Sequence, residues 1–266
     1  MRILLTNDDG IYAPGLRAMR KELQKLGDVV VCAPATEQSA AGHSVTLLAP
    51  LIVQEIFDEQ KEFLGWAVEG RPADCVKLAL VELLPSLPDL IVSGLNAGSN
   101  AGINVMYSGT VAAAVEGAFF RCTAIALSQS YRKPTQIDFP AGAAVARQVV
   151  EQILASNPKP GSLFNVNLPS ADLGPPKGLK VLPQNVAVYQ ESFVRNVDPR
   201  GRTYFWLGAE YGCAEPHPDT DESALQQGYV TLTPLHFDLT DHKMVAAMQG
   251  REWTLEKQTP TVTVWS

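Results

Sequence analysis

Short runs of hydrophobic residues alternate with longer segments of helical periodicity over the first 170 residues. Each run is apolar at consecutive positions, as expected for a strand whose two faces are both covered. We expect such buried strands at residues 3–6, 29–33, 90–92, 124–127 and 163–168, and two more at 45–53 and 63–68.

The segments between these runs predict helices. Leu16, Met19, Leu23 and Leu26 recur at helical spacing after Pro14, and Gly27 can end that helix. Further helices are expected from Pro72, over residues 110–116 and over 139–154. Strands that alternate with helices indicate the α/β class, with a parallel sheet between two helical layers. Ligands of such sheets bind beyond the carboxyl ends of the strands, so the loops at Asp8, Ser39 and Asn96 are the places to look.

After Pro169 the alternation stops. Residues 180–182, 202–207 and 229–235 predict strands with no intervening helices, and residues 240–248 predict a last helix. We expect hairpins and arms that serve contacts between subunits. The chain is interpreted as a single domain over 1–266, with a core of about 1–170 and an extension of about 171–266.

Composition narrows the function classes. Nearly half of the 266 residues are hydrophobic, and the formal net charge is −7, which argues against a nucleic-acid polymer as partner. A small anionic substrate is compatible, because a bound cation reverses the local field. No apolar stretch of roughly 18 residues predicts a membrane span, and the chain begins directly with a strand-like run. With four isolated cysteines suited to core packing, Cys32, Cys75, Cys122 and Cys213, we expect a cytoplasmic protein with no membrane partner.

The adjacent carboxylates Asp8 and Asp9 are the strongest chemical signal. Side chains of neighbouring strand residues point to opposite faces, so the two converge only where the strand ends, and Gly10 permits that turn. A divalent cation makes such a pair favourable, because hard cations prefer oxygen ligands. The alternative is a simple turn in which Asp9 caps the following helix.

Two later loops carry polar groups. Hydroxyls and backbone N–H groups of the loop containing Ser39, Gly42 and Ser44 are candidates for binding metal or phosphate, and His43 is a candidate proton donor to a leaving alkoxide, or else a solvated histidine. The third loop is rich in glycine and asparagine, and Asn96 offers a neutral oxygen to a metal. It ends at Ser108-Gly109-Thr110, before an alanine-rich helix whose N-terminus is a candidate phosphate site or an ordinary helix capped by Ser108.

Together these motifs resemble the survival protein SurE family. The matching segments occur in the family's order: residues 2–10, 33–39, 93–100, 107–111, 165–169, 198–202 and 228–235. The resemblance implies a Rossmann-like three-layer α/β/α sandwich with a C-terminal β-hairpin or arm extension, and a homodimer or homotetramer. It also implies a 5′-nucleotidase that converts nucleoside monophosphates to nucleoside and phosphate, with possible 3′-nucleotidase or exopolyphosphatase activity. The family's metal ligands fall on Asp8, Asp9, Ser39 and Asn96.

The expected chemistry is phosphomonoester hydrolysis with one divalent cation per subunit, Mg²⁺ or Mn²⁺. Asp8, Asp9 and Asn96 are the expected catalytic residues, and the expected phosphate or substrate contacts are Gly42, His43, Ser44, Ser108, Gly109 and Thr110. Direct attack by water and a covalent aspartyl-phosphate on Asp8 both stay open. Two other functions fit the same features: a nucleotide-binding module without turnover, and a glycosyltransferase that uses a sugar nucleotide.

Overall fold

The computed structural model describes residues 1–266 except positions 41, 59, 134–136, 188–191, 209–214 and 255–266. The chain divides into two units, Met1–Leu235 and His236–Ser266. In the second unit the described structure contains α6 (His242–Gln249), close to the predicted helix, and the Asp241 side chain accepts a hydrogen bond from Met244 N at its start. No helix among the described residues is long and apolar enough to cross a membrane.

The first unit is built on a nine-stranded sheet of order β3-β4-β2-β1-β5-β6-β7-β11-β8. From β4 to β7 neighbouring strands are parallel, whereas β3 and β11 run antiparallel to β4 and β7. The strands are β1 (Arg2–Thr6), β2 (Asp28–Pro34), β3 (Val53–Phe57), β4 (Phe63–Val68), β5 (Leu90–Ala97), β6 (Thr123–Gln129), β7 (Leu163–Leu168), β8 (Leu179–Val181) and β11 (Val230–Leu235). Strand order reverses at β1, which lies between β2 and β5.

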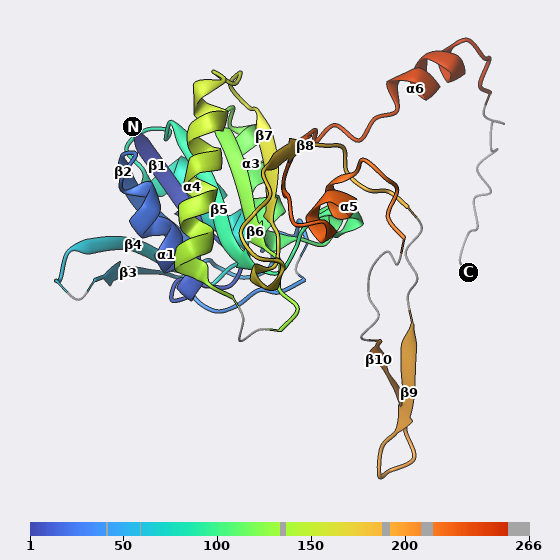
Figure 1. Ribbon diagram of the computed structural model, residues 1–266, viewed down its shortest axis with the longest axis horizontal. Helices are drawn as coiled ribbons and strands as arrows, with labels where there is room; N and C mark the ends of the chain where they lie inside the picture. The colour runs from blue at the N-terminus through green and yellow to red at the C-terminus, as the bar shows by residue number, and fades with distance from the viewer. Residues whose placement is uncertain (41, 59, 134–136, 188–191, 209–214, 255–266) are drawn as a thin grey trace, which may run out of the picture. The chain divides into compact units, whose positions relative to one another are not determined.

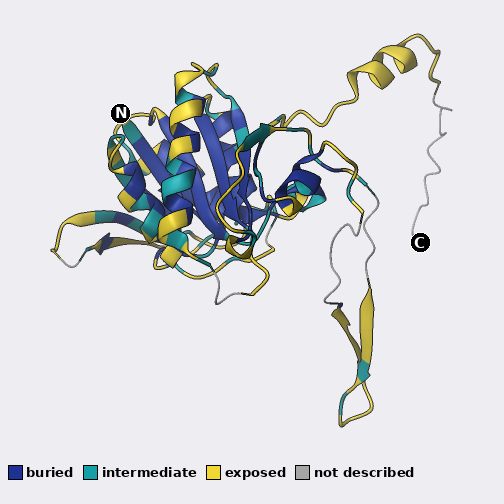
Figure 2. Cartoon of the chain, in the orientation of Figure 1, coloured by how far each residue is buried: buried dark blue, intermediate teal, exposed yellow. Residues whose placement is uncertain are grey.

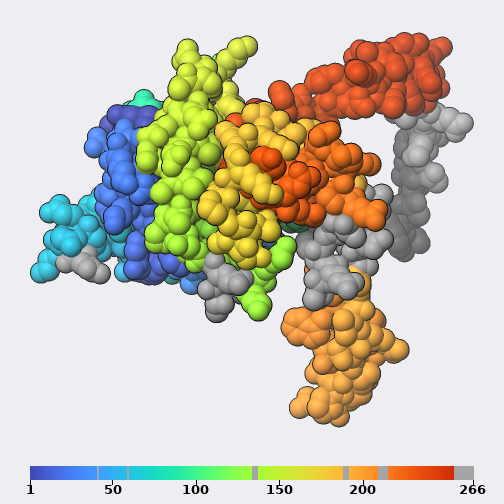
Figure 3. Space-filling model, viewed as in Figure 1, coloured from blue at the N-terminus to red at the C-terminus, as the bar shows by residue number. Residues whose placement is uncertain are grey.

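Helices cover both faces of this sheet, so the three-layer sandwich is confirmed (Figure 1). One hydrophobic cluster joins the sheet to α1 (Pro14–Leu23) and α4 (Phe139–Ala155), which the Arg147–Glu22 ion pair also links at 3.0 Å. The surfaces of α1 and α4 lie side by side in Figure 3. The second hydrophobic cluster joins the other face of the sheet to α2 (Pro72–Leu78), the π-helical turn Ala79–Leu83 and α3 (Gly109–Phe119). Cys32, Cys75 and Cys122 are buried, as predicted, and Cys213 lies outside the described residues.

The C-terminal part of the first unit contributes to the sheet and adds a hairpin. Strands β8 and β11 extend the sheet past residue 170, while β9 (Phe193–Val197) and β10 (Thr203–Leu207) form a separate antiparallel pair. Both hairpin strands are exposed almost throughout (Figure 2). The single-domain boundaries and the role of the hairpin in assembly stay predictions. The other short helices of the first unit are Gly102–Met106, between β5 and α3, and Ala171–Leu173 and α5 (Asp221–Gln226) in its C-terminal part.

Two expectations about strands were wrong. Residues 45–52 are not a strand, because Leu47 and Leu48 are exposed rather than packed, and Pro50 has no N–H to donate to a ladder. The sheet is also not purely parallel, because β3 pairs antiparallel with β4, which follows it after a short turn, and β11 from the C-terminal part pairs antiparallel with β7. Helix α5 and strand β9 were not predicted, since both are short and follow loop-like sequence.

Candidate functional site

The turn after β1 places the acidic pair at the carboxyl edge of the sheet. The Asn7 side chain closes the turn: its Nδ2 donates to Gly10 O at 3.0 Å, and Gly10 N donates to its Oδ1 at 3.2 Å. Gly10 has a φ of +99°, a backbone conformation that favours glycine. Helix α1 has Ala13 at its N-cap with no side-chain cap, so Asp9 does not cap that helix.

Asp8 is buried against the start of α3. The Thr110 hydroxyl donates to Asp8 Oδ1 at 2.6 Å, and the Thr110 main chain also contributes a hydrogen bond to this carboxylate. Asp9 lies on the other side of the turn, where Ala97 N approaches its Oδ2 at 3.4 Å. The pair therefore lies between β5 and the N-terminus of α3, where the order of strands reverses.

The environment favours the protonated form of both carboxyl groups. Burial raises the pKa of Asp8, and the Thr110 hydrogen bonds offset only part of that effect. Burial and then the neighbouring Asp8 charge raise the pKa of Asp9 to about 7. Among the described residues neither carboxylate forms an ion pair, so their mutual repulsion has no cationic counterpart in the protein itself.

The loop after β2 reaches the same edge. The Ser39 hydroxyl donates to the Glu37 carboxylate, and Gly42 N donates to Tyr107 O at 3.0 Å, which ties this loop to the segment before α3. Ser44 is half-buried in the same loop.

His43 points at a buried carboxylate on α3. Its Nε2 lies 2.7 Å from Glu116 Oε1, its ring stacks on Phe119 with centroids 5.8 Å apart, and Lys77 Nζ lies 3.6 Å from Glu116 Oε2. Glu116 is 2% exposed, so His43 anchors the loop on the helix. A role for His43 as proton donor stays a prediction, and with Nε2 turned toward Glu116 the proton would come from Nδ1.

The end of β5 and the third loop, which follows it, supply the remaining groups. Asn96 Nδ2 donates to Gly98 O at 2.9 Å, which leaves the side-chain oxygen as the atom available to a cation. Ser108 is the N-cap of α3, because its hydroxyl accepts from Val111 N at 3.0 Å. The cap by Ser108 is therefore confirmed, whereas a phosphate site at this helix start stays a prediction.

A cavity of about 660 Å³ joins these loops. Of the residues predicted from sequence, Asp8, Ser39, Asn96 and Ser108 line it. Asp9, Gly109 and Thr110 adjoin Asp8, whereas Gly42, His43 and Ser44 are not among the lining residues. Sequence reasoning did not assign Asn100 and Asn104, which line the cavity from the same glycine- and asparagine-rich run. The Tyr107 ring adds an aromatic side chain to the lining.

The donor set fits a hard divalent cation. Carboxylate, hydroxyl and amide oxygens converge there, and among the described residues the buried Asp8 and the half-buried Asp9 have no cationic partner. Within the described part of the chain no three His, Cys, Asp or Glu side chains gather, so a cation here depends on neutral oxygens as well.

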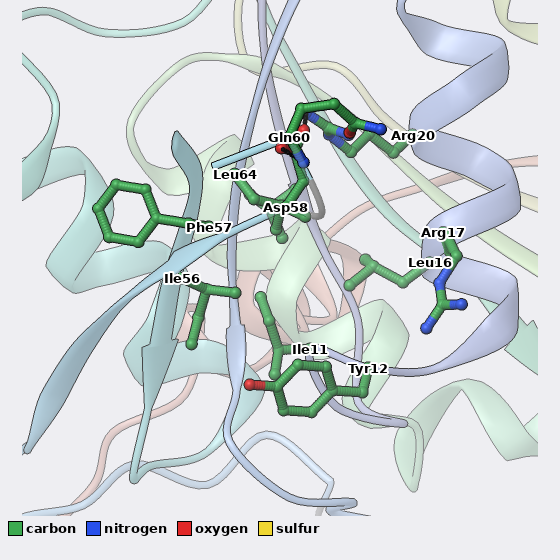
Figure 4. A pocket seen from close by; sticks show the side chains of 11 residues that line it. Ile11, Tyr12, Leu16, Arg17, Arg20, Ile56, Phe57, Asp58, Gln60 and Leu64 are labelled. Carbon is green, nitrogen blue, oxygen red and sulfur yellow. Dashed lines mark hydrogen bonds and ion pairs between the residues drawn. The ribbon is translucent and has the colours of Figure 1, made fainter. Parts of the chain in front are cut away.

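A second cavity, of about 320 Å³, lies between α1 and the β3–β4 pair (Figure 4). Its floor is apolar, and among the described residues its lining contains a single carboxylate, Asp58, whose Oδ2 lies 3.9 Å from Arg20 Nη2. This lining groups fewer oxygen ligands for a cation than the cavity at Asp8 does.

Comparison with known proteins agrees with this geometry. The family model described as survival protein SurE matches residues 3–191. The chain is 48% identical to a 5′-nucleotidase SurE of Rhodopirellula baltica over 96% of this chain and 99% of that protein, and 43% identical to one of Pelotomaculum thermopropionicum over 94% of both. The crystal structure of the SurE protein from Aquifex aeolicus superimposes with a TM-score of 0.81 at 38% identity, covering 94% of this chain and 98% of that one. The chain therefore belongs to the SurE family.

Proposed function

We propose that the protein is a metal-dependent 5′-nucleotidase, which hydrolyses nucleoside 5′-monophosphates to nucleoside and phosphate. The observation that carries this proposal is the placement of Asp8 on the N-terminus of α3, in a cavity also lined by Ser39, Asn96 and Ser108. Acidic oxygens and helix N–H groups side by side suit a cation and a phosphate bound together. Relatives that carry the name 5′-nucleotidase SurE support the same substrate class.

Asp8, Asp9, Ser39 and Asn96 would hold the cation. A bound divalent cation supplies positive charge that polarises the phosphoryl group and acidifies a neighbouring water. The identity of the ion, Mg²⁺ or Mn²⁺, and a stoichiometry of one per subunit are part of the proposal.

Phosphate binding and proton transfer are carried out by groups of the chain itself. Ser108 and the first N–H groups of α3 hold phosphate oxygens and oppose the charge that develops on them. Asp9 accepts the proton of the attacking water on a carboxylate oxygen that the cation leaves free. The water oxygen attacks phosphorus, the bond from phosphorus to the 5′ oxygen breaks, and the nucleoside alkoxide takes up a proton that Asp9 returns directly or through solvent. The covalent route through Asp8 would instead leave a phosphorylated Asp8 that can be trapped during turnover.

The test is phosphate release from AMP in EDTA and then with Mn²⁺ or Mg²⁺, comparing wild type, Asp8→Asn and Asp28→Asn. Asp28 is an exposed aspartate at the opposite end of β2 from the site, so its variant controls for loss of charge. Metal-dependent release that Asp8→Asn abolishes and Asp28→Asn retains is expected. Absence of release from every nucleotide with every metal would overturn the proposal.

The same assay extends to 3′-nucleotides and polyphosphate, which are the proposed further substrates. A cytoplasmic location and a homodimer or homotetramer stay predictions. Light scattering of the purified protein measures the oligomeric state directly.

A further inference from the structure

Two residues of the third loop have both of their main-chain polar groups held by distant side chains. Asn100 N donates to Asn167 Oδ1 at 2.8 Å, and Asn165 Nδ2 donates to Asn100 O at 2.9 Å. Gly102 N donates to Asp221 Oδ2 at 2.9 Å, and Gln184 Nε2 donates to Gly102 O at 2.8 Å. The path of this loop is therefore fixed by four side chains from β7 and the C-terminal segment.

Asp221 is the only charged member of this set, and it is completely buried. Its Oδ1 accepts hydrogen bonds from Asn185 N at 2.8 Å and Glu222 N at 2.7 Å, and its Oδ2 accepts the one from Gly102. A buried carboxylate is tolerated when N–H donors satisfy it, and hydrogen bonds to a charged acceptor are the strong ones. One of the three donors that keep this carboxylate stable thus belongs to the loop.

Gly102 begins the short 3-10 helix Gly102–Met106, which presents Asn104 to the cavity and leads to Tyr107 and Ser108. A 3-10 helix of this length is weak by itself and needs tertiary support. The proposed cation ligands Asp8 and Asn96 have hydrogen bonds of their own, with Thr110 and with Gly98, and neither bond involves Asp221 or Gly102. Among the described residues the loop reaches Thr110 only through Asn100, whose Nδ2 lies 3.4 Å from the Thr110 hydroxyl. Asp221 therefore supports the wall that meets the phosphate and nucleoside, rather than the acidic pair.

We propose that Asp221 is a positioning residue, which acts through Gly102 to hold the substrate side of the cavity. The proposal rests on the nucleotidase function proposed above. It assigns a role in the site to a residue that lies 119 positions from the loop it holds.

Asp221→Asn is the sharpest variant. The asparagine oxygen can keep the bonds from Asn185 and Glu222, but its NH₂ group then faces the N–H of Gly102, so two donors meet. Glu222→Gln is the matched control, since it removes the neighbouring charge while its amide oxygen can still accept from Asn185 Nδ2. Both are compared with wild type for AMP binding by calorimetry in EDTA, where the proposed metal-dependent hydrolysis does not consume the AMP, for KM and kcat with Mn²⁺, and for Mn²⁺ affinity by electron paramagnetic resonance.

For Asp221→Asn, AMP affinity is expected to fall and KM to rise by about tenfold or more, with kcat within about threefold and Mn²⁺ affinity unchanged. Glu222→Gln should match wild type. Unchanged AMP affinity in a folded Asp221→Asn protein would overturn the proposal, and so would an equal loss of Mn²⁺ affinity. If Asp221→Asn does not fold, Gln184→Ala tests the proposal instead. Gln184 is half-buried and donates the other hydrogen bond to Gly102, so this variant should weaken AMP binding by a smaller factor. If the wild-type protein binds AMP but releases no phosphate, the nucleotidase function is refuted, and the effect of Asp221→Asn on AMP affinity still tests the positioning role.

Discussion

The Thr110 hydroxyl donates a hydrogen bond to Asp8 Oδ1 at 2.6 Å, across 102 positions of sequence. This bond joins the end of β1 to the first turn of α3, so one side chain links the acidic pair to the helix N-terminus that would receive phosphate. Hydrogen bonds to a carboxylate favour its charged form, and this one opposes the effect of burial on the pKa of Asp8.

Thr110→Val should therefore raise the pKa of Asp8 further and weaken cation binding through competition with a proton. We expect the Mn²⁺ concentration needed for half-maximal phosphate release at pH 7 to rise by about tenfold. Thr110→Ser keeps the hydroxyl and should stay within about threefold of wild type. An equal loss in both variants would mean that the threonine methyl group matters rather than its hydrogen bond.

Sequence patterns predicted the positions of several candidate site residues along the fold, where these depend on local structure. The break after the first hydrophobic run placed Asp8 and Asp9 at the end of β1, and Ser39 lies in the loop after β2 as expected, whereas Asn96 lies near the end of β5 rather than in the loop after it. These positions follow from short-range signals, because a buried strand must end before a polar turn begins.

The contacts between those loops were beyond sequence reasoning. Asp221 follows a loop-like run with no helical or strand periodicity, and only the folded chain brings it to Gly102. His43 appears as a free loop histidine in the sequence, yet it meets Glu116 across 73 positions. Hydrogen bonds between residues so far apart in the sequence depend on tertiary packing, which hydrophobic periodicity does not predict.

The raised pKa of Asp9 predicts how stability depends on pH without metal. In the unfolded chain Asp9 loses its proton near its ordinary pKa of 3.8, whereas in the folded chain it does so near pH 7. Between these values the folded state binds more protons, so the free energy of unfolding of the metal-free protein falls as the pH rises. Asp8 shifts in the same direction.

Between pH 5 and pH 8 in EDTA, we expect the free energy of unfolding to fall by on the order of 1 kcal/mol, which lowers the melting temperature by a few degrees. Asp9→Asn should lose most of this dependence, and Mn²⁺ should stabilise the wild type more at pH 8 than at pH 5. A wild-type melting temperature that rises over the same range relative to Asp9→Asn would contradict the shift.

The ion pairs of Glu116 predict unequal effects of its two partners. His43→Ala leaves a buried carboxylate without its 2.7 Å partner, and we expect a loss of about 2 kcal/mol. Lys77 lies 3.6 Å away with half of its side chain exposed, so Lys77→Ala should cost less than about 1 kcal/mol. Urea denaturation measures both, and a loss for Lys77→Ala as large as that for His43→Ala would contradict this ranking of the two partners.

Gly109 tests how closely α3 must approach the acidic pair. A Cβ added there would lie 2.9 Å from Asp8 Cβ, 3.0 Å from Asp8 Oδ2 and 3.2 Å from Pro72 Cγ. Its backbone conformation is helical, so Gly109→Ala creates a spatial conflict rather than backbone strain. Either Asp8 or the start of the helix must shift by a few tenths of an ångström, and misplacement on this scale lowers kcat/KM by roughly 10- to 100-fold. At Gly250 the nearest atom to an added Cβ is Ala247 O at 3.9 Å, so Gly250→Ala is the matched control and should retain activity. If Gly109→Ala keeps full activity, the close contact between helix and carboxylate is not required, and phosphate must be held elsewhere in the cavity.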